Sequence, residues 1–280
     1  DFKLILLLLK RGININEQNN DGMTALHFIC QKPYYSKKII MILLDNGADP
    51  NIRDKYDLTP LHLMCIHEKE LHFIELLLEY ITDDKSTNYT GINTMTIEGN
   101  TPLHYACSGN YNIKIIKILL QHNANPNIRN ISGNSPLHRV CLNKIISNKF
   151  IIKNIIPLFI KYNVNLNIQN NKGNTFFHLM CKKGLQSKEL ICLIVNNNFN
   201  LNIKNNKGQR CLHYICQDGF DKEIIELFLE NGASINDYYL MNNFIFYKKL
   251  TLNIKDKIFK IFNDNTPLIN DLYDLVCNYL

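Results

Sequence analysis

The sequence predicts an all-α solenoid built from repeated helix–loop–helix units, and three observations predict it. A tetrad similar to Thr-Pro-Leu-His occurs six times, at residues 24–27, 59–62, 101–104, 135–138, 175–178 and 210–213. The tetrad histidines lie 35, 42, 34, 40 and 35 residues apart, a spacing typical of stacked supersecondary units. Each copy ends in an apolar run followed by a turn similar to Gly-Ala-Asp-x-Asn, as in LLDNGADPN ending at Asn51.

Each copy predicts two helices. The first begins after a capping residue that can satisfy free backbone N–H groups, and a following proline suits the first helical position. The predicted N-caps are Thr24, Thr59, Thr101, Ser135 and Thr175. Apolar residues at helical spacing predict the second helix, as in 113–120 and 224–229. It ends at a residue that tolerates the left-handed conformation, such as Gly47, Asn123 or Gly232.

The two halves of a copy differ in how strictly their length is kept. From the turn to the next histidine the distance is 15 residues in five copies, and 24 only between Tyr80 and His104. One extra residue here would rotate apolar side chains off their face, whereas a surface loop lengthens at small entropic cost. We therefore expect a longer interhelical loop near Leu142–Phe150 and an enlarged polar finger within Ile81–Thr96.

These residues resemble the ankyrin repeat, a unit of about 33 residues that contains Thr-Pro-Leu-His-x-Ala. TPLHYAC at 101–107 and NGADPN at 46–51 match it well, while the tetrads ending at His178 and His213 are degenerate. The resemblance covers residues 1 to about 236, with six full copies and a truncated leading copy at 1–12 whose start we expect to be missing. It implies a curved stack of helix pairs with hairpin fingers on one side.

A cysteine follows each tetrad histidine by three residues. The pairs are His27 and Cys30, His62 and Cys65, His104 and Cys107, His138 and Cys141, His178 and Cys181, and His213 and Cys216. Both residue types bind zinc, but a structural zinc needs four converging ligands, and a whole repeat separates the pairs. The resemblance implies that the histidine bonds backbone between neighbouring repeats and that the cysteine packs as a small apolar side chain. We expect no metal and no cofactor.

We also expect no catalysis and no nucleic-acid binding. A nucleophilic cysteine must be exposed and activated by a base, and Cys192, Cys211 and Cys277, which lie off the repeated position, have no clear partner in the sequence. The net charge of +6 arises from 31 basic and 25 acidic residues without a dense basic cluster. A modest basic patch, formed by Lys172, Lys182, Lys183 and Lys207, fits an acidic protein segment better.

Composition indicates where the protein works. The nine cysteines do not form an even disulfide framework, no signal peptide is visible, and the apolar run Leu4–Leu9 is too short to cross a bilayer. We expect a reduced intracellular monomer that does not bind membranes. Its 41 asparagines and abundant isoleucine and lysine are typical of AT-rich genomes. With cysteine at the repeated position, the chain is similar to ankyrin proteins of poxviruses, especially bird poxviruses, or of obligate intracellular bacteria, which places it in the host cytoplasm or nucleus.

The resemblance implies protein recognition through a concave groove, lined by finger residues and by residues four and five past each histidine. Carried over, this predicts as binding residues Met23, Gln31, Lys32, Tyr56, Leu58, Ile66, His67, Glu98, Asn100, Ser108, Asn134, Leu142, Lys172, Asn174, Lys182, Lys183, Lys207, Gln209 and Gln217. Tyr56, Leu58 and Ile66 are unusually apolar for such positions. Asp57 replaces the expected glycine, so we expect the second finger to be distorted.

Residues 237–280 contain no glycine and nine aromatic residues, a composition that favours a packed helical segment over a disordered tail. One interpretation is a degenerate repeat that caps the stack. The other follows the poxvirus resemblance, in which a terminal F-box-like element recruits a Skp1–cullin ubiquitin ligase. Its usual Leu-Pro-x-Glu-Ile start is not recognisable here, and an element in sequence beyond residue 280 is the alternative place for it. The sequence thus predicts a pathogen factor that binds a host protein, with a ligase adaptor or an endogenous scaffold of an AT-rich organism as alternatives.

Overall fold

The computed structural model describes residues 2–32, 37–68, 70–81, 91–109, 112–143, 148–184, 187–216 and 222–234. Its chain contacts divide the protein into two units, residues 1–171 and residues 172–280, here called unit 1 and unit 2. Every regular element in the described ranges is helical, with no strand. The predicted all-α class is therefore correct.

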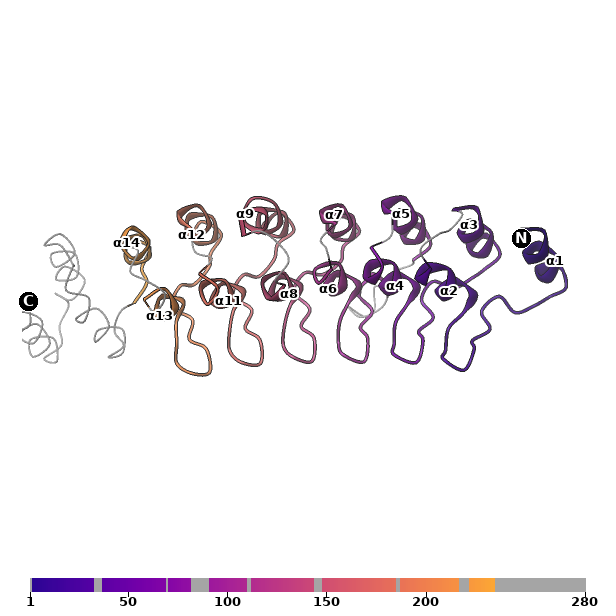
Figure 1. The fold of residues 1–280 in the computed structure, drawn as a ribbon, viewed down its shortest axis with the longest axis horizontal. Helices are drawn as coiled ribbons and strands as arrows, with labels where there is room; N and C mark the ends of the chain where they lie inside the picture. Colours follow the sequence, from indigo (N-terminus) through magenta and orange to yellow (C-terminus); the bar gives the residue numbers. More distant parts are fainter. Residues whose placement is uncertain are drawn as a thin grey trace, which may run out of the picture. The chain divides into compact units, whose positions relative to one another are not determined.

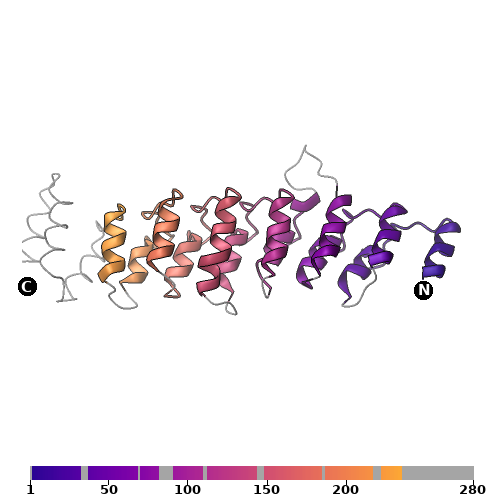
Figure 2. The same ribbon diagram turned by 90° about the horizontal axis from the view of Figure 1, so that it is seen from above.

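Unit 1 consists of a leading helix followed by four helix pairs. Its elements are α1 Phe2–Lys10, α2 Ala25–Gln31, α3 Lys37–Asp45, α4 Pro60–Ile66, α5 Leu71–Tyr80, the 3₁₀ turn η1 Gly91–Asn93, α6 Pro102–Ala106, α7 Ile113–Gln121, α8 Pro136–Leu142, α9 Asn148–Phe150, the π-helical turn η2 Ile151–Ile155 and α10 Ile156–Lys161. The first helices α2, α4, α6 and α8 form one row, with hairpins projecting beyond it (Figure 1). The second helices lie side by side in another row (Figure 2).

In its described residues, unit 2 repeats the same plan with two helix pairs. The first helices are α11 Phe176–Cys181 and α13 Cys211–Ile215, and the second helices are α12 Lys188–Val195 and α14 Lys222–Glu230. Neighbouring first helices contact one another, as do neighbouring second helices. The predicted boundary near residue 236, and all of 237–280, lie outside the described residues, so the interpretation of that segment stays a prediction.

The predicted helix starts are confirmed, because each first helix begins directly after Thr24, Thr59, Thr101, Ser135 or Thr175. The predicted stops are confirmed as well. Gly47, Asn123 and Gly232 have φ values of 87°, 66° and 81°, the left-handed conformation that ends a helix and that glycine and asparagine tolerate.

The core of each unit lies between the two rows of helices. The third residue of each tetrad, a leucine in five copies and Phe177 in the fifth, is buried, and so is the cysteine three residues past each histidine. In unit 2 the large side chains are aromatic, with Phe177 stacked on Phe228 and edge-on to Phe199. Burying one such side chain contributes on the order of 2 kcal/mol, so the tetrad is chiefly a packing motif.

One predicted loop is shorter than expected. Residues 148–150, placed in a long interhelical loop by the sequence, already belong to α9. A π-helical turn then follows, just before Pro157. Proline has no N–H to donate to the carbonyl four residues earlier, and its ring clashes with that carbonyl. A wider turn relieves both problems, which explains how the extra residues are absorbed into the helix.

Candidate functional site

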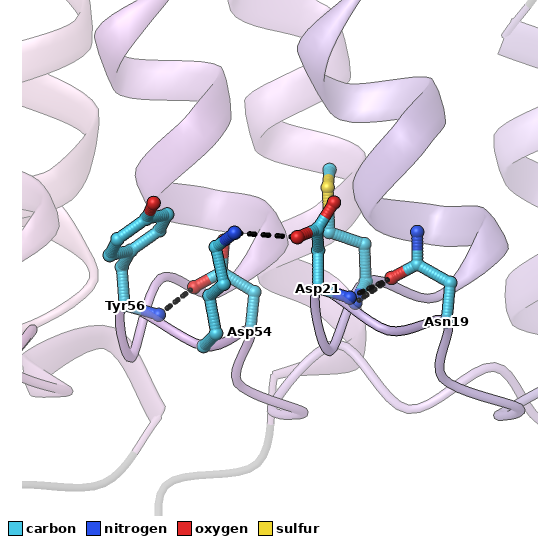
Figure 3. A network of polar contacts seen from close by, with 6 residues as sticks. Asn19, Asp21, Asp54 and Tyr56 are labelled. Atoms are coloured by element: carbon cyan, nitrogen blue, oxygen red, sulfur yellow. Dashed lines mark hydrogen bonds and ion pairs between the residues drawn. The ribbon is translucent and has the colours of Figure 1, made fainter.

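Six hairpin fingers precede the first helices, and each is five residues long. They span 19–23, 54–58, 96–100, 130–134, 170–174 and 205–209, and are numbered fingers 1 to 6. In finger 1 the side-chain oxygen of Asn19 accepts backbone N–H bonds from Asp21 at 3.0 Å and Met23 at 2.9 Å. In finger 2 Asp54 accepts from the backbone N–H of Tyr56 at 2.8 Å (Figure 3). It also accepts from the backbone N–H of Leu58 at 2.9 Å. Such Asx turns fix the finger backbone locally.

Backbone hydrogen bonds also join each finger to the next. The N–H of the second finger residue donates to the carbonyl of the third residue in the preceding finger. The bonds are Lys55 to Asp21 at 2.9 Å, Ile97 to Tyr56 at 3.2 Å, Ile131 to Glu98 at 3.1 Å and Asn171 to Ser132 at 3.1 Å in unit 1, and Asn206 to Lys172 at 3.1 Å in unit 2. Because the backbone makes these bonds, the side chains at both positions are not needed to hold the fingers together.

The fourth finger residue has to adopt positive φ. Gly22 and Gly99 have φ values of 76° and 72°, and a Cβ on either would lie within about 3 Å of the next finger's backbone. Asp57 takes the same conformation, with φ of 59°, and finger 2 keeps its Asx turn and its bonds to both neighbours. The expected distortion of finger 2 is therefore wrong, since aspartate tolerates the left-handed region.

The tetrad histidine links adjacent repeats. In His62, Nδ1 accepts from the backbone N–H of Thr59 at 3.1 Å, and Nε2 lies 3.2 Å from the carbonyl oxygen of Asn100 in the next finger. Since Nδ1 is an acceptor, the proton is on Nε2, which donates to that carbonyl. Equivalent bonds join His27 to Leu58, His104 to Asn134 and, in unit 2, His178 to Gln209. The role that the resemblance implied for the histidine is confirmed.

Burial keeps His62 and His104 neutral, whereas the pKa of His178 is raised, because the effect of burial, which lowers it, is outweighed by its contact with Cys211. Removal from water disfavours the imidazolium and lowers the pKa of His62 to about 3 and that of His104 to about 4. His138 and His213 are buried too, and their Nδ1 atoms accept from the backbone N–H groups of Ser135 and Arg210. The tetrad histidines are therefore structural at neutral pH.

A second link between repeats is an asparagine eleven residues before the histidine. Asn127 donates from Nδ2 to the carbonyl of Asn163 at 3.3 Å and accepts the N–H of Asn165 at 2.7 Å. Asn16, Asn93 and Asn202 make the same pair of bonds to the following turn. The sequence interpretation missed this role, although asparagine occupies the position in all six copies, at residues 16, 51, 93, 127, 167 and 202.

Comparisons with known proteins agree with this geometry. The sequence profile of ankyrin repeats in three copies matches residues 1–90 and 146–239, and that of a single ankyrin repeat matches residues 98–131. The chain belongs to the ankyrin-repeat family. The ankyrin-repeat domain of Bcl-3, described as a unique member of the IκB protein family, superposes with a TM-score of 0.62 over 81% of this chain and 91% of that one, at 21% identity.

A curated relative matches a short stretch of the chain. Human transient receptor potential cation channel subfamily A member 1 is 45% identical over 62 residues, which are 22% of this chain. The matched stretch spans only 5% of the channel's length. The likeness therefore concerns a short segment of each protein. Among the described helices of this ankyrin protein, none is both long and apolar enough to cross a membrane.

The repeated cysteines of the ankyrin stack are buried free thiols, as expected. Burial raises the pKa of Cys65 and Cys107 above the usual range and that of Cys216 to about 12. Cys211 has neighbours that the sequence did not reveal. Burial alone would raise the pKa of its thiol, but hydrogen bonds with the Cys181 thiol and the His178 imidazole of the preceding repeat lower it to about 6. In the described ranges no three His, Cys, Asp or Glu side chains gather closely enough to hold a metal ion.

The predicted binding residues divide by exposure. Exposed are Gln31, Lys32, Tyr56, Ile66, His67, Glu98, Leu142, Lys172, Lys182, Lys183 and Lys207, and half-buried are Met23, Leu58, Ser108, Asn174 and Gln209. Gln217 lies outside the described residues. Asn100 and Asn134 are only 4% and 8% exposed, and their side-chain oxygens accept from Asn130 and Asn170 at 2.8 and 2.9 Å. They hold fingers together, so their prediction as partner contacts is corrected.

Two exposed apolar finger residues were not among the predicted binding residues. Ile97 and Ile131 are 58% and 67% exposed, and both are second residues of their fingers. The binding positions implied by the resemblance begin at the third finger residue and therefore do not include them. Beside them in finger 2, Tyr56 is 51% exposed, and the Nζ atom of Lys55 lies 5.0 Å from its ring while pairing with Asp21 (Figure 3). An alternating apolar and polar pattern at the tips is the sequence signal that could have found them.

Proposed function

We propose that this ankyrin stack is a non-catalytic protein-binding module whose unit 1 fingers contact the partner. The observation that carries the proposal is a run of exposed apolar side chains on consecutive fingers, Tyr56, Ile97 and Ile131. Single exposed apolar residues are common, but clusters of them mark interaction sites. These three lie on fingers 2, 3 and 4, whose backbones are bonded to one another.

The repeat architecture supports this function because the groups that hold the repeats together are not the side chains exposed at the finger tips. Backbone bonds, buried histidines and the asparagine links hold the repeats together. The tip side chains are thus presented on a pre-ordered backbone, which lowers the entropic cost of binding. Aromatic and branched apolar tips such as Tyr56 and Ile131 offer contact area with few rotatable bonds, the profile of binding hot spots.

The test compares three versions of the full chain in affinity capture from vertebrate cell lysate. The finger variant carries Tyr56→Ser, Ile97→Ser and Ile131→Ser, and the control variant carries Met41→Ser, an exposed apolar residue on the second helix α3. We expect a protein captured by wild type and by the control to be lost by the finger variant. Retention of the same protein by the finger variant would refute the proposal.

We further propose that the partner is a host protein met in the host cytoplasm. The asparagine-rich composition and the buried cysteine at the repeated position support this, because both accompany the resemblance to ankyrin proteins of poxviruses and intracellular bacteria. The test compares affinity capture from vertebrate lysate with capture from protist lysate. A partner captured only from the vertebrate lysate supports a host protein. The reverse result would favour an endogenous scaffold.

The ubiquitin-ligase adaptor depends on residues 237–280, outside the described residues. A chain of residues 1–236 and the full chain distinguish the two interpretations of that segment. Capture of Skp1 and cullin by the full chain alone would support a recruiting element. Capture of one shared partner by both chains, without ligase components, would support a terminal cap.

A further inference from the structure

Among the described residues of unit 2, charge is segregated between the finger and first-helix layer and the layer of second helices. Residues 172–187 and 196–216, which form the fingers and first helices with their adjoining turns, contain no aspartate or glutamate. Five exposed lysines lie there: Lys172, Lys182, Lys183, Lys204 and Lys207. The described carboxylates of unit 2 all lie on the second helices α12 and α14, where Glu223 pairs with Lys188.

The positive charge at the tips is not a requirement of the frame. Lys172 and Lys207 are the third residues of fingers 5 and 6, and the backbone N–H beside Lys207, that of Asn206, donates to the carbonyl of Lys172. The third residues of fingers 1 to 4 are Asp21, Tyr56, Glu98 and Ser132. The same backbone geometry thus accepts acidic, aromatic, polar or basic side chains. Because the frame does not require lysine at this position, we attribute the two adjacent lysines to the chemistry of the binding partner.

We propose that the finger and first-helix face of unit 2 docks an acidic protein segment. The inference rests on the proposed protein-binding function and deepens it, because it names the chemistry of one part of the partner. The exposed lysines of this face attract a negative segment and speed its encounter. Asp218 and Asp221, which follow α13 in the sequence, lie outside the described residues. The lysines extend from fingers whose backbone is already fixed, so binding orders only their side chains.

The described face favours protein over single-stranded nucleic acid as the source of that negative charge. Sites for single strands combine basic residues with exposed aromatic rings on which bases stack. In the described part of unit 2, Phe176, Phe177 and Phe199 are buried. The ring of Tyr214 is half-buried, and its hydroxyl bonds both Asn205 and Gln209. No described ring is therefore displayed beside the lysines.

The test measures fluorescence anisotropy with the full chain and three labelled probes of equal length. The probes are a peptide of alternating glutamate and serine, a peptide of alternating glutamine and serine, and oligothymidylate. The variant is Lys172→Glu with Lys207→Glu, and the control is Lys114→Glu with Lys117→Glu, two exposed lysines on α7 of unit 1. Both pairs change the net charge equally, and circular dichroism confirms that both fold.

We expect the glutamate peptide to bind, the glutamine peptide not to bind, and binding to weaken as salt rises. The finger reversal should weaken it about tenfold, since each exposed charge pair contributes up to about 1 kcal/mol, and the α7 reversal should leave it nearly unchanged. Equal loss in both variants, no binding of the glutamate peptide, or tighter binding of oligothymidylate would overturn the proposal. The Ile97→Ser and Ile131→Ser chain should still bind the peptide, which separates this proposal from that for unit 1.

Discussion

Lowering the pH from 7 to 5 should reduce the contribution that the buried, neutral His62 and His104 make to the stability of the ankyrin stack. His62 and His104 are neutral in the folded chain, with pKa values of about 3 and about 4 against 6.5 for an exposed histidine. The unfolded chain therefore takes up protons below pH 6.5 that the folded chain refuses. Stability is complete above pH 6.5 and falls as the pH drops toward the folded pKa.

The size of the effect follows from the difference in pKa. Each pH unit between the two values costs about 1.4 kcal/mol per histidine. At pH 5 the loss is therefore about 2 kcal/mol for His62 and about 2 kcal/mol for His104 relative to pH 7. The window lies above the range in which ordinary carboxylates titrate, so the histidines dominate it.

Urea unfolding followed by circular dichroism at pH 7, 6 and 5 measures the loss. A chain carrying His104→Gln should be less stable at pH 7, because it lacks the imidazole that bridges Thr101 and Asn134. Its further loss on going to pH 5 should nevertheless be smaller by about 2 kcal/mol. The control replaces His122, which is exposed. The reasoning fails if His104→Gln and wild type lose the same stability between pH 7 and 5.

Three substitutions test the frame by thermal or urea unfolding. Asn127→Ala removes two bonds to the next repeat and should cost about 1–3 kcal/mol, whereas Asn51→Ala should cost less, because its Oδ1 already has no partner; equal costs would contradict the link. Gly99→Ala should cost more than Gly47→Ala, since both have positive φ but only the first Cβ meets backbone, at 3.0 Å; the reverse order would contradict the close approach. Cys107→Asp places a charge in a fully buried position and should cost several kcal/mol; a melting curve like that of the wild type would show that the position is not packed.

Much of the frame could be predicted because its repeats carry strong local signals. Capping residues, proline and glycine act over three or four positions, so Thr59 and Gly47 could be assigned without tertiary information. The histidine role came from the resemblance, since the carbonyl of Asn100 lies 38 residues beyond His62. The π-helical turn before Pro157 could not be found by periodicity, because it breaks the 3.6-residue pattern on which that method depends.

The candidate site was predicted less completely because exposure at a finger depends on its neighbours. Asn100 and Asn174 occupy the same finger position, yet the first is buried and the second half-buried. Ile97 reads as a core residue by composition, but its backbone N–H donates to the carbonyl of Tyr56 in the preceding finger and its side chain faces solvent. A single sequence contains the residue types, whereas their accessibility arises from stacking.

The unsatisfied side-chain oxygen of Asn51 marks a weak point in unit 1. At this junction, between the second and third copies, the asparagine link is incomplete, although His62 and the Ile97 amide still bridge it. In a linear array stability is close to a sum of repeat and nearest-neighbour terms. The weakest interface then sets where the array opens first. The repeats before this junction are thus expected to unfold together while the later repeats of unit 1 stay folded. A protease or an unfoldase would therefore act first on the segment before Asn51.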